Sequence, residues 1–462
     1  MSIGHFRNTI IGQIIYNILQ QTGCDHFNRN YIGDRGTAFG KFVTSLHYHY
    51  QQDPTIVDQI IANPESMMGV VYGKFKEIDV ADKEEKARVI VQLLESGNTD
   101  MIELWTQIRT LSLVDFETVY KTLGVEFDCT LGESFAVQLD NKVLQDLQSK
   151  HIVHESQGAL IIKLKRTEEG SRKPLQTHEL DTREEGRDQV LVFAKSDGST
   201  LYAPRDLSLL KYRSQVIQAD NMIYVVGSEQ SVYFQQIIAL GIYLGYIKDN
   251  QMMHLGFGLY LQNGKKMASR TGGAYRVMEL IEEITQAILQ QFEERMDHDS
   301  AQKLAVSALI INDTKGDISK DVNLDIASMT KLNGDTGVYV QYTAVRLKSL
   351  IQKIVGTSSI IPTLKFPPEK ITYLSPEEKS LLFQTSLLAY KTRQSLDLIK
   401  PHVLTQYLLD LAGRFNKRYN DSPKVLEMDE HKKQALYPVL ESYRIVFEKV
   451  MTLLHLPVVE KM

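Results

Sequence analysis

Apolar residues recur at helical spacing near the start of the chain. Positions three and four apart are occupied by Ile10, Ile11, Ile14, Ile15, Ile18 and Leu19. This pattern predicts a helix with one buried face, which begins near His5 and is followed by Gly23 as a C-terminal cap. A short strand is predicted over residues 27–31, and it leads into the turn Gly33-Asp34-Arg35-Gly36. In α/β folds, ligands bind at the ends of strands, where a glycine-rich turn leads into a helix.

The middle of the chain combines helical and strand patterns. Residues from about 44 to 125 are mostly helical in pattern and include the only tryptophan, Trp105, so we expect an inserted helical subdomain. Residues 150–165 predict a hairpin with its turn at Ser156-Gln157-Gly158, and the polar stretch 166–188 is expected at the surface. The core fold is expected to resume at residues 189–193, where an uninterrupted apolar run predicts a buried strand.

Another strand-helix unit follows, and the rest of the chain is helical in pattern. Residues 222–226 predict an apolar strand, and the helix after it carries Phe234, Ile237, Ile238 and Leu244. Residues 254–260 predict a strand that enters a basic loop. Beyond about residue 275 helical spacing continues to the end, so a helical bundle is predicted over residues 334–462.

Composition limits the class of protein. A chain of 462 residues is too long for one core and suits two or three domains. Its hydrophobic content of 43% and charged content of 24% are ordinary for a soluble globular protein. It contains no uncharged apolar run of membrane-spanning length and no signal-peptide pattern, so we expect a cytoplasmic protein. Cys24 and Cys129 lack the spacing of zinc or redox sites and are expected to be buried free thiols.

The net charge of −5 argues against a general nucleic-acid binder, but the charge is unevenly distributed. Residues 334–462 carry 18 Lys or Arg and 13 Asp or Glu, a balance of +5 that leaves −10 for the rest. A basic C-terminal part suits a polyanionic partner bound at one end. Ordinary scatter of surface charge is the alternative explanation.

Two motifs suggest an ATP site. Gly4 lets the backbone approach a nucleotide, and His5 at a helix N-terminus can donate hydrogen bonds there. The basic run Lys265-Lys266-Met267-Ala268-Ser269-Arg270 follows Gly264 and precedes Gly272-Gly273, so this loop can close over a triphosphate. Each motif alone is weak, because a Gly-His pair is usually an ordinary turn and a basic run is usually a solvated surface.

Together with Asn30-Tyr31-Ile32-Gly33-Asp34-Arg35-Gly36-Thr37-Ala38-Phe39-Gly40-Lys41, these motifs resemble the class I aminoacyl-tRNA synthetases, specifically the arginyl-tRNA synthetases, over nearly the whole chain. The resemblance implies an α/β fold with a Rossmann-like nucleotide-binding catalytic domain over 1–275, with a helical insertion at about 44–188. A helical connector over 276–333 and an all-α anticodon-binding bundle over 334–462 would follow. The implied activity is an arginine-tRNA ligase that uses ATP with Mg²⁺ to form arginyl-adenylate and then charges tRNA(Arg).

The resemblance also assigns residues to the ATP and arginine sites. Catalytic roles are implied for His5, Lys266 and Arg270, and further ATP contacts for Gly4, Met267 and Ser269. Arginine would be bound by His5, by Tyr202 and Asp206 in the segment after Ser196-Asp197-Gly198, and by Gln236, with Gln235 as the alternative register. From spacing alone Tyr202 and Asp206 share one helical face, but a capping or surface aspartate is the more usual explanation of such a pair, and only the resemblance reverses this. A carboxylate with an aromatic hydroxyl suits a guanidinium.

The tRNA contacts are expected in the bundle. The segment 334–346 is similar to the entry into the anticodon-binding bundle of the family, and it implies contacts from Tyr339, Tyr342 and Arg346. Asn416, in a second aromatic, basic and amide-rich segment, is expected to join them. Aromatic residues at helical spacing usually belong to a core, and about half of these are expected to do so.

The chain departs from the family pattern in several places. Ser2 stands where the family has a first histidine, and Ser269 stands where the basic loop has a second lysine. The family's upstream asparagine, compensating lysine, first strand and tRNA-elbow domain would all precede Met1. We therefore expect the sequence to be a piece of a longer enzyme, and the piece alone to be unstable or inactive. A monomer is expected. The alternatives are a catalytically impaired paralogue that binds tRNA or a protein partner, and another nucleotidyl-transferring α/β enzyme.

Overall fold

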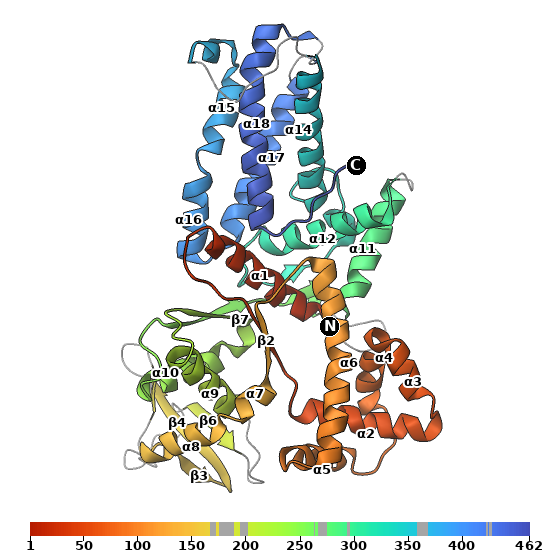
Figure 1. Ribbon diagram of the computed structural model, residues 1–462, viewed down its shortest axis with the longest axis vertical. Coiled ribbons are helices and arrows are strands. Elements are labelled where there is room, and N and C mark those ends of the chain that lie inside the picture. The colour runs from red at the N-terminus through yellow and green to blue at the C-terminus, as the bar shows by residue number, and fades with distance from the viewer. Residues whose placement is uncertain are drawn as a thin grey trace. The chain divides into compact units, whose positions relative to one another are not determined.

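The computed structural model describes residues 1–166, 172–174, 189–194, 202–262, 264–266, 275–292, 296–357, 368–421, 424 and 427–462 (Figure 1). They form two compact units. Unit 1 comprises Met1–Asn28, Lys121–Glu126 and Phe257–Met462, and unit 2 comprises Arg29–Tyr120 and Phe127–Gly256.

Unit 1 begins with the predicted amphipathic helix. Helix α1 spans Ile3–Gln20 and buries one face, including Phe6, Ile10 and Ile14. It packs on four helices of the same unit, α11 (Val277–Gln291), α12 (His298–Thr314), α16 (Leu388–Leu398) and α18 (Glu430–Leu453). Gly23 adopts a positive φ of 73° three residues beyond the helix, where the chain turns away.

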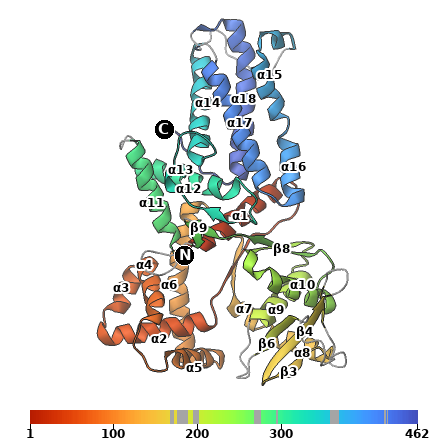
Figure 2. The ribbon, with the colours of Figure 1, turned by 180° about the vertical axis from the view of Figure 1, so that it is seen from behind.

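The rest of unit 1 is mostly helical, as predicted. Figures 1 and 2 show α14, α17 and α18 side by side along their length, with α15 beside them. Leu347, Leu408 and Val450 are among the residues that fill the space between them. The elements are β9 (Tyr260–Gln262), β10 (Lys265–Lys266), α11 (Val277–Gln291), α12 (His298–Thr314), β11 (Val322–Asn323), α13 (Ile326–Met329), α14 (Gly337–Thr357), η4 (Pro368–Tyr373), α15 (Pro376–Thr385), α16 (Leu388–Leu398), α17 (His402–Asp421) and α18 (Glu430–Leu453).

The first part of unit 2 is the predicted helical subdomain. Its elements are α2 (Thr37–Gln52), α3 (Ile56–Ala62), α4 (Pro64–Gly73), η1 (Lys74–Lys76), α5 (Lys83–Glu95) and α6 (Thr99–Leu123), of which the last residues belong to unit 1. Helix α2 lies very close to α5, because a Cβ on Gly40 would meet the carbonyl oxygen of Ala87 at 2.1 Å. Two apolar clusters, around Phe42 and around Phe75, hold the helices together.

The second part of unit 2 combines short parallel strands with helices. Strand β1 (Arg29–Ile32) pairs in parallel with β2 (Cys129–Gly132), and β7 (Met222–Gly227) pairs with β8 (Met252–Phe257). The helices are α7 (Glu133–Val137), α8 (Asp140–Ser149), α9 (Tyr202–Gln215), η3 (Ser228–Gln230) and α10 (Ser231–Tyr243). Leu207 and Leu210 from α9 share a buried core with Phe234, Ile237 and Leu240 from α10. The parallel strands therefore end beside helices, which is where α/β folds carry ligands.

The predicted hairpin is present, but the strand after it differs from the expectation in its burial. Strands β3 (His154–Ser156) and β4 (Ala159–Arg166) are antiparallel and turn at Gln157-Gly158, both with positive φ. Strand β6 (Gln189–Ala194) pairs antiparallel with β4 in the same sheet, which also contains β5 (Arg172–Pro174). Leu191 and Phe193 are buried, whereas Val190 is 50% exposed and Val192 37%. The prediction of a buried strand therefore holds for one face of β6 only, because alternate residues of this antiparallel strand are exposed.

Two other expectations are settled by the structure. Both cysteines are free, but the prediction that they are buried was wrong, since Cys24 is exposed and Cys129 is partly exposed. Cys24 follows the turn that ends α1, where the chain runs along the surface. Among the described residues, no helix has the length and apolar character needed to cross a membrane.

Candidate active site

The Gly4-His5 pair lies at the first turn of α1, as predicted. The ring of His5 is held by Ser2, since the Ser2 backbone N–H lies 3.2 Å and its Oγ 2.9 Å from His5 Nδ1. Desolvation by the surrounding protein lowers the pKa of His5, although the residue keeps an exposed edge. His5 lies at the start of α1, at the positive end of the helix dipole.

Residues on both sides of the basic loop are anchored in unit 1. Before it, β10 pairs antiparallel with β9, so that Lys266 lies opposite Leu261. After it, Ile3 N–H donates to the carbonyl of Tyr275 at 2.8 Å, and Val277 N–H donates to that of Met1 at 3.2 Å. The residue after the loop is thus joined to the start of α1. Met267, Ser269 and Arg270 lie outside the described residues.

Arg7 fixes α1 within unit 1. Its Nε lies 2.7 Å from Asp313 Oδ1 at the end of α12, and both side chains are almost completely buried. Its terminal nitrogens donate to the carbonyls of Gly258 at 2.7 Å and of Ile318 at 3.1 Å. Gly258 separates β8 from β9, so the long strand predicted over 254–260 is in fact two. Arg7 therefore holds the helix that carries His5 against the segment that leads into the basic loop.

Unit 2 contains another carboxylate that is partly shielded from solvent, Asp206 on the second turn of α9. The hydroxyl of Tyr233 on α10 donates to Asp206 Oδ2. Within the described ranges, Asp206 has no Lys, Arg or His nitrogen within 4.0 Å. Burial raises the pKa of Asp206, while Arg213 and Arg205 act more weakly in the opposite direction. The pKa of Tyr233 and of Tyr31 is also raised, by burial and then by the charge of Asp206.

Arg205, the neighbour of Asp206 in sequence, is paired elsewhere. It donates to Glu133 at 2.8 Å and lies 3.5 Å from Glu95. Burial raises the pKa of Glu133 to about 7, against the lowering effect of Arg205. The second nearby arginine, Arg213, lies over the ring of Tyr224 at 5.0 Å. Both guanidinium groups therefore have partners of their own in this region.

The glycine-rich turn after β1 is clamped by Asp34. Asp34 accepts hydrogen bonds from the backbone N–H and the hydroxyl of Ser134, each at 2.8 Å, and pairs with Arg109 at 2.8 Å. Gly132 makes room for it, because a Cβ there would meet Asp34 Oδ2 at 2.0 Å. The indole of Trp105 donates to the carbonyl of Asp34 at 2.5 Å. The motif 30–41 is thus tied to α6 and α7.

The remaining residues predicted to bind arginine also lie in unit 2. Tyr202 is the first residue of α9, one turn before Asp206, and is 60% exposed. Gln236 is buried on α10, one turn after Tyr233. His5 belongs to the other unit. Sequence reasoning missed Tyr233, although its i, i+3 spacing to Gln236 places both on one helical face.

The four residues predicted to contact tRNA form one cluster on α14 and α17. The guanidinium of Arg346 lies between the rings of Tyr342, at 4.3 Å, and Tyr419, at 4.7 Å. It also donates to Asn416 Oδ1 at 3.1 Å, and the hydroxyl of Tyr339 donates to the carbonyl of Ala412. Asn416 is buried, whereas the tyrosines and Arg346 keep exposed edges.

Comparison with known proteins matches both parts of the chain. A family model described as the catalytic domain of class I (R) tRNA synthetases matches residues 1–325, and the DALR anticodon-binding domain matches residues 340–462. Arginine–tRNA ligase of Clostridium acetobutylicum is 30% identical and arginine–tRNA ligase 2 of Bacillus anthracis 31% identical. Each alignment covers 100% of this chain and 77% of the relative.

Solved structures show the same fold. The arginyl-tRNA synthetase of Thermus thermophilus matches with a TM-score of 0.78 at 22% identity, covering 100% of this chain and 80% of that one. The enzyme of Plasmodium falciparum matches with a TM-score of 0.76 at 22% identity, covering 100% of this chain and 74% of that one. The predicted resemblance is confirmed, and the chain belongs to the arginyl-tRNA synthetase family, with a class I catalytic domain followed by a helical DALR domain.

Proposed function

We propose that this protein is an arginine-tRNA ligase that activates L-arginine with ATP and transfers it to tRNA(Arg). Its relatives over the whole chain bear that name. The observation in unit 2 that best supports it is the environment of Asp206. This carboxylate is partly buried, accepts a hydrogen bond from Tyr233 and, among the residues described, has no cationic partner within ion-pair distance. A buried charge without a partner is costly, so a site of this kind suits a cationic ligand.

The chemistry around Asp206 favours a guanidinium. A planar guanidinium can donate two parallel hydrogen bonds to one carboxylate, whereas an ammonium donates as a point charge. Arg205 is already paired with Glu133 and Glu95, so its charge is compensated within the protein. In this proposal Asp206 pairs with the substrate guanidinium, while Tyr202 and Gln236, which belong to the same unit, contact the rest of the amino acid.

The proposed ATP contacts come from the start of α1 and from the basic loop. One oxygen of the arginine carboxylate attacks the α-phosphorus, and the bond to pyrophosphate breaks. Gly4, His5, Lys266, Met267, Ser269 and Arg270 are proposed to hold the nucleotide. Positive charge from Lys266 and Arg270 would stabilise the pyrophosphate as it leaves. A ribose hydroxyl of tRNA then attacks the activated carbonyl carbon, and AMP leaves.

Magnesium is proposed to enter with ATP. The described ranges contain no group of three or more His, Cys, Asp or Glu arranged to hold a metal ion. Mg²⁺ is commonly bound by substrate phosphates with few protein ligands, so ATP itself would carry most of its ligands. The ion would neutralise phosphate charge, while the chain's own residues position the two substrates.

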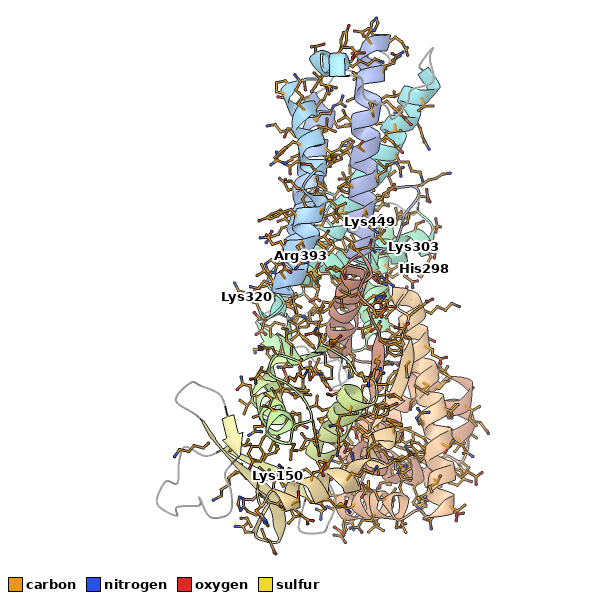
Figure 3. All side chains as sticks on the ribbon, turned by 60° about the vertical axis from the view of Figure 1, so that its left-hand side comes forward. Lys150, His298, Lys303, Lys320, Arg393 and Lys449 are labelled. Atoms are coloured by element: carbon orange, nitrogen blue, oxygen red, sulfur yellow. The ribbon has the colours of Figure 1, made fainter. Side chains whose placement is uncertain are left out.

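The tRNA is proposed to contact the cluster around Arg346. In unit 1 several basic side chains have acidic neighbours: Lys303 lies 2.7 Å from Asp299, and Arg393 in the bundle lies 2.8 Å from Asp397 (both basic residues are labelled in Figure 3). Arg346 instead has two aromatic rings and an amide as described partners, so its positive charge is not compensated locally. An arginine on aromatic faces can bind phosphate or stacked bases.

The test is a charging assay with the natural-length protein. We expect ATP-dependent charging of tRNA with arginine, and discrimination against lysine by at least about a hundredfold, because a buried acceptor site rejects a ligand that leaves it poorly paired. Lys266→Ala should slow adenylate formation in a single turnover with little change in arginine affinity, and Lys265→Ala is the matched control. A protein that binds tRNA but activates no amino acid would replace this proposal with the impaired paralogue.

A further inference from the structure

The contacts of the His5 ring determine which of its nitrogens carries the proton. A neutral imidazole has one N–H donor and one acceptor nitrogen, and the partners of the ring decide between the two tautomers. At His5 the Nδ1 atom faces the backbone N–H of Ser2 at 3.2 Å. A backbone N–H can only donate, so Nδ1 must be the acceptor. The Ser2 hydroxyl, 2.9 Å away, can rotate to donate to the same atom.

We propose that Ser2 is a positioning residue that holds His5 in the tautomer with its proton on Nε2. The opposite edge of the ring then presents a fixed N–H donor. This inference rests on the proposed function for its use, because a donor at the start of α1 is what a nucleotide phosphate or a developing negative charge requires. Among the described residues, Ser2 is the only hydrogen-bond partner of the ring.

Ser2 is held in place by the segment that follows the basic loop. It forms an antiparallel bridge with Arg276, made by the bonds from Ile3 N–H to Tyr275 and from Val277 N–H to Met1. These bonds use the N–H of Ile3 and the carbonyl of Met1. The N–H of Ser2 itself is therefore available to donate to His5. The tautomer of His5 is therefore set by a residue whose position depends on residues 275–277.

Ser2 is the position at which the resemblance implies a histidine in the family, and the contacts of Ser2 show what a serine does there. Where the family has a histidine, the chain has a small hydroxyl residue with φ −89° and ψ 160°, at the N-cap of α1. Any residue other than proline supplies a backbone N–H donor at this position. A serine adds its hydroxyl as a second donor. The substitution thus reinforces the tautomer of His5.

The direct test is nitrogen NMR of the natural-length protein with ¹⁵N-labelled histidine, without substrates and at a pH where the ring is neutral. The His5 signals are assigned by their loss in His5→Gln. We expect a pyridine-like Nδ1 and a pyrrole-like Nε2. A pyrrole-like Nδ1 in the unaltered protein overturns the proposal, and this result does not depend on activity or on any variant that fails to fold.

Variants then test the role of Ser2. Ser2→Ala keeps the N–H and should keep the tautomer, and Ser2→Thr should match the unaltered protein. Ser2→Pro removes the N–H donor, and the bridge to Arg276 does not use that N–H, so both tautomers should be populated. Unchanged nitrogen shifts in Ser2→Pro would show that Ser2 does not set the tautomer.

Kinetics separate positioning from folding. The single-turnover rate of arginine activation should fall in Ser2→Pro by about two- to tenfold, in proportion to the fraction of the wrong tautomer, with arginine affinity unchanged. A rate that does not follow the tautomer fraction across the variants contradicts the role, even when the spectrum is as expected. A correct tautomer in a protein that activates no amino acid would instead count against the proposed function.

Discussion

Each unit shields a helical carboxylate from solvent, completely for Asp313 in unit 1 and partly for Asp206 in unit 2, and the two charges are balanced in different ways. In unit 1, Asp313 lies 2.7 Å from the guanidinium of Arg7, which also donates to the carbonyls of Gly258 and Ile318. In unit 2, Asp206 accepts a hydrogen bond from Tyr233, and no cation among the described residues reaches it. Burial raises the pKa of both carboxyl groups.

Asp313 therefore belongs to a structural ion pair, whereas Asp206 is the group proposed to bind the ligand. Arg7 uses its donors on groups from separate segments of unit 1, so the pair determines where these segments lie. Removing one partner of such a pair leaves an uncompensated buried charge. Asp206 already lacks a charge partner, so its removal relieves the folded protein of a cost while it removes the group proposed to pair with arginine. The two carboxylates should therefore respond to substitution with opposite signs in stability.

The largest effect is expected from Arg7→Met. It leaves Asp313 buried without its cation, and the loss of unfolding free energy should be about 3–5 kcal/mol. Amide hydrogen exchange of α1 and α12 measures it in unit 1, with exposed Arg393→Met as the control. The double variant Arg7→Met with Asp313→Leu should recover most of the loss, because it removes both charges. A loss below about 1 kcal/mol would mean that the pair does not hold α1.

Asp206→Asn should separate stability from activity. Arginine activation should fall about 10- to 150-fold, since a hydrogen bond to a charged group is worth about 1.5–3 kcal/mol. Near neutral pH its thermal stability should equal or exceed that of the unaltered protein. A carboxyl with a raised pKa in the folded state adds stability below its unfolded pKa, and this is lost as the pH rises. Exposed Asp249→Asn is the control, and a large loss of stability would place Asp206 with Asp313 instead.

A smaller, pH-dependent effect is expected at Glu133. Its folded pKa of about 7 exceeds its ordinary value of 4.5, so its contribution to stability is present below about pH 4.5 and is lost as the pH rises through 7. Glu133→Gln should flatten this part of the pH profile of unit 2. Trp105, the only tryptophan and a member of unit 2, reports its unfolding by fluorescence. Exposed Glu155→Gln should leave the profile unchanged, and identical profiles for both variants would contradict the assignment.

The charge of Arg346 has described partners, but they are aromatic rings and an amide rather than an opposite charge as at Asp313. Arg346→Ala should lower tRNA affinity and reduce the slope of affinity against salt by about one, if it neutralises one phosphate. It should also cost about 1 kcal/mol of bundle stability through the lost ring contacts. Arg393→Ala, which removes a charge already paired with Asp397, should leave the slope nearly unchanged. Equal slopes for both variants would remove Arg346 from the tRNA contacts.

Local pattern alone was enough to predict much of the fold. The spacing of isoleucines predicted α1, the turn at Gln157-Gly158 predicted the hairpin, and the periodicity beyond residue 275 predicted the helices of unit 1. The Gly4-His5 pair and the basic run 265–270, read with residues 30–41, were sufficient for the family. These features depend on neighbours within a few residues, or on short stretches of sequence whose chemistry is specific, and both can be read without coordinates.

Partners far apart in sequence were decided only by the tertiary structure. Arg7 meets Asp313, Asp34 is clamped by Ser134, and Asp206 is paired with Tyr233, although no local pattern links the members of each pair. The burial of β6 was mispredicted on one face for the same reason, since an apolar run does not say which strand it will pair with or how much of each face will be covered. Hydrophobic periodicity shows which face of an element is buried. Which polar groups meet there depends on how separate segments pack, and that balance of burial and pairing exists only in the folded chain.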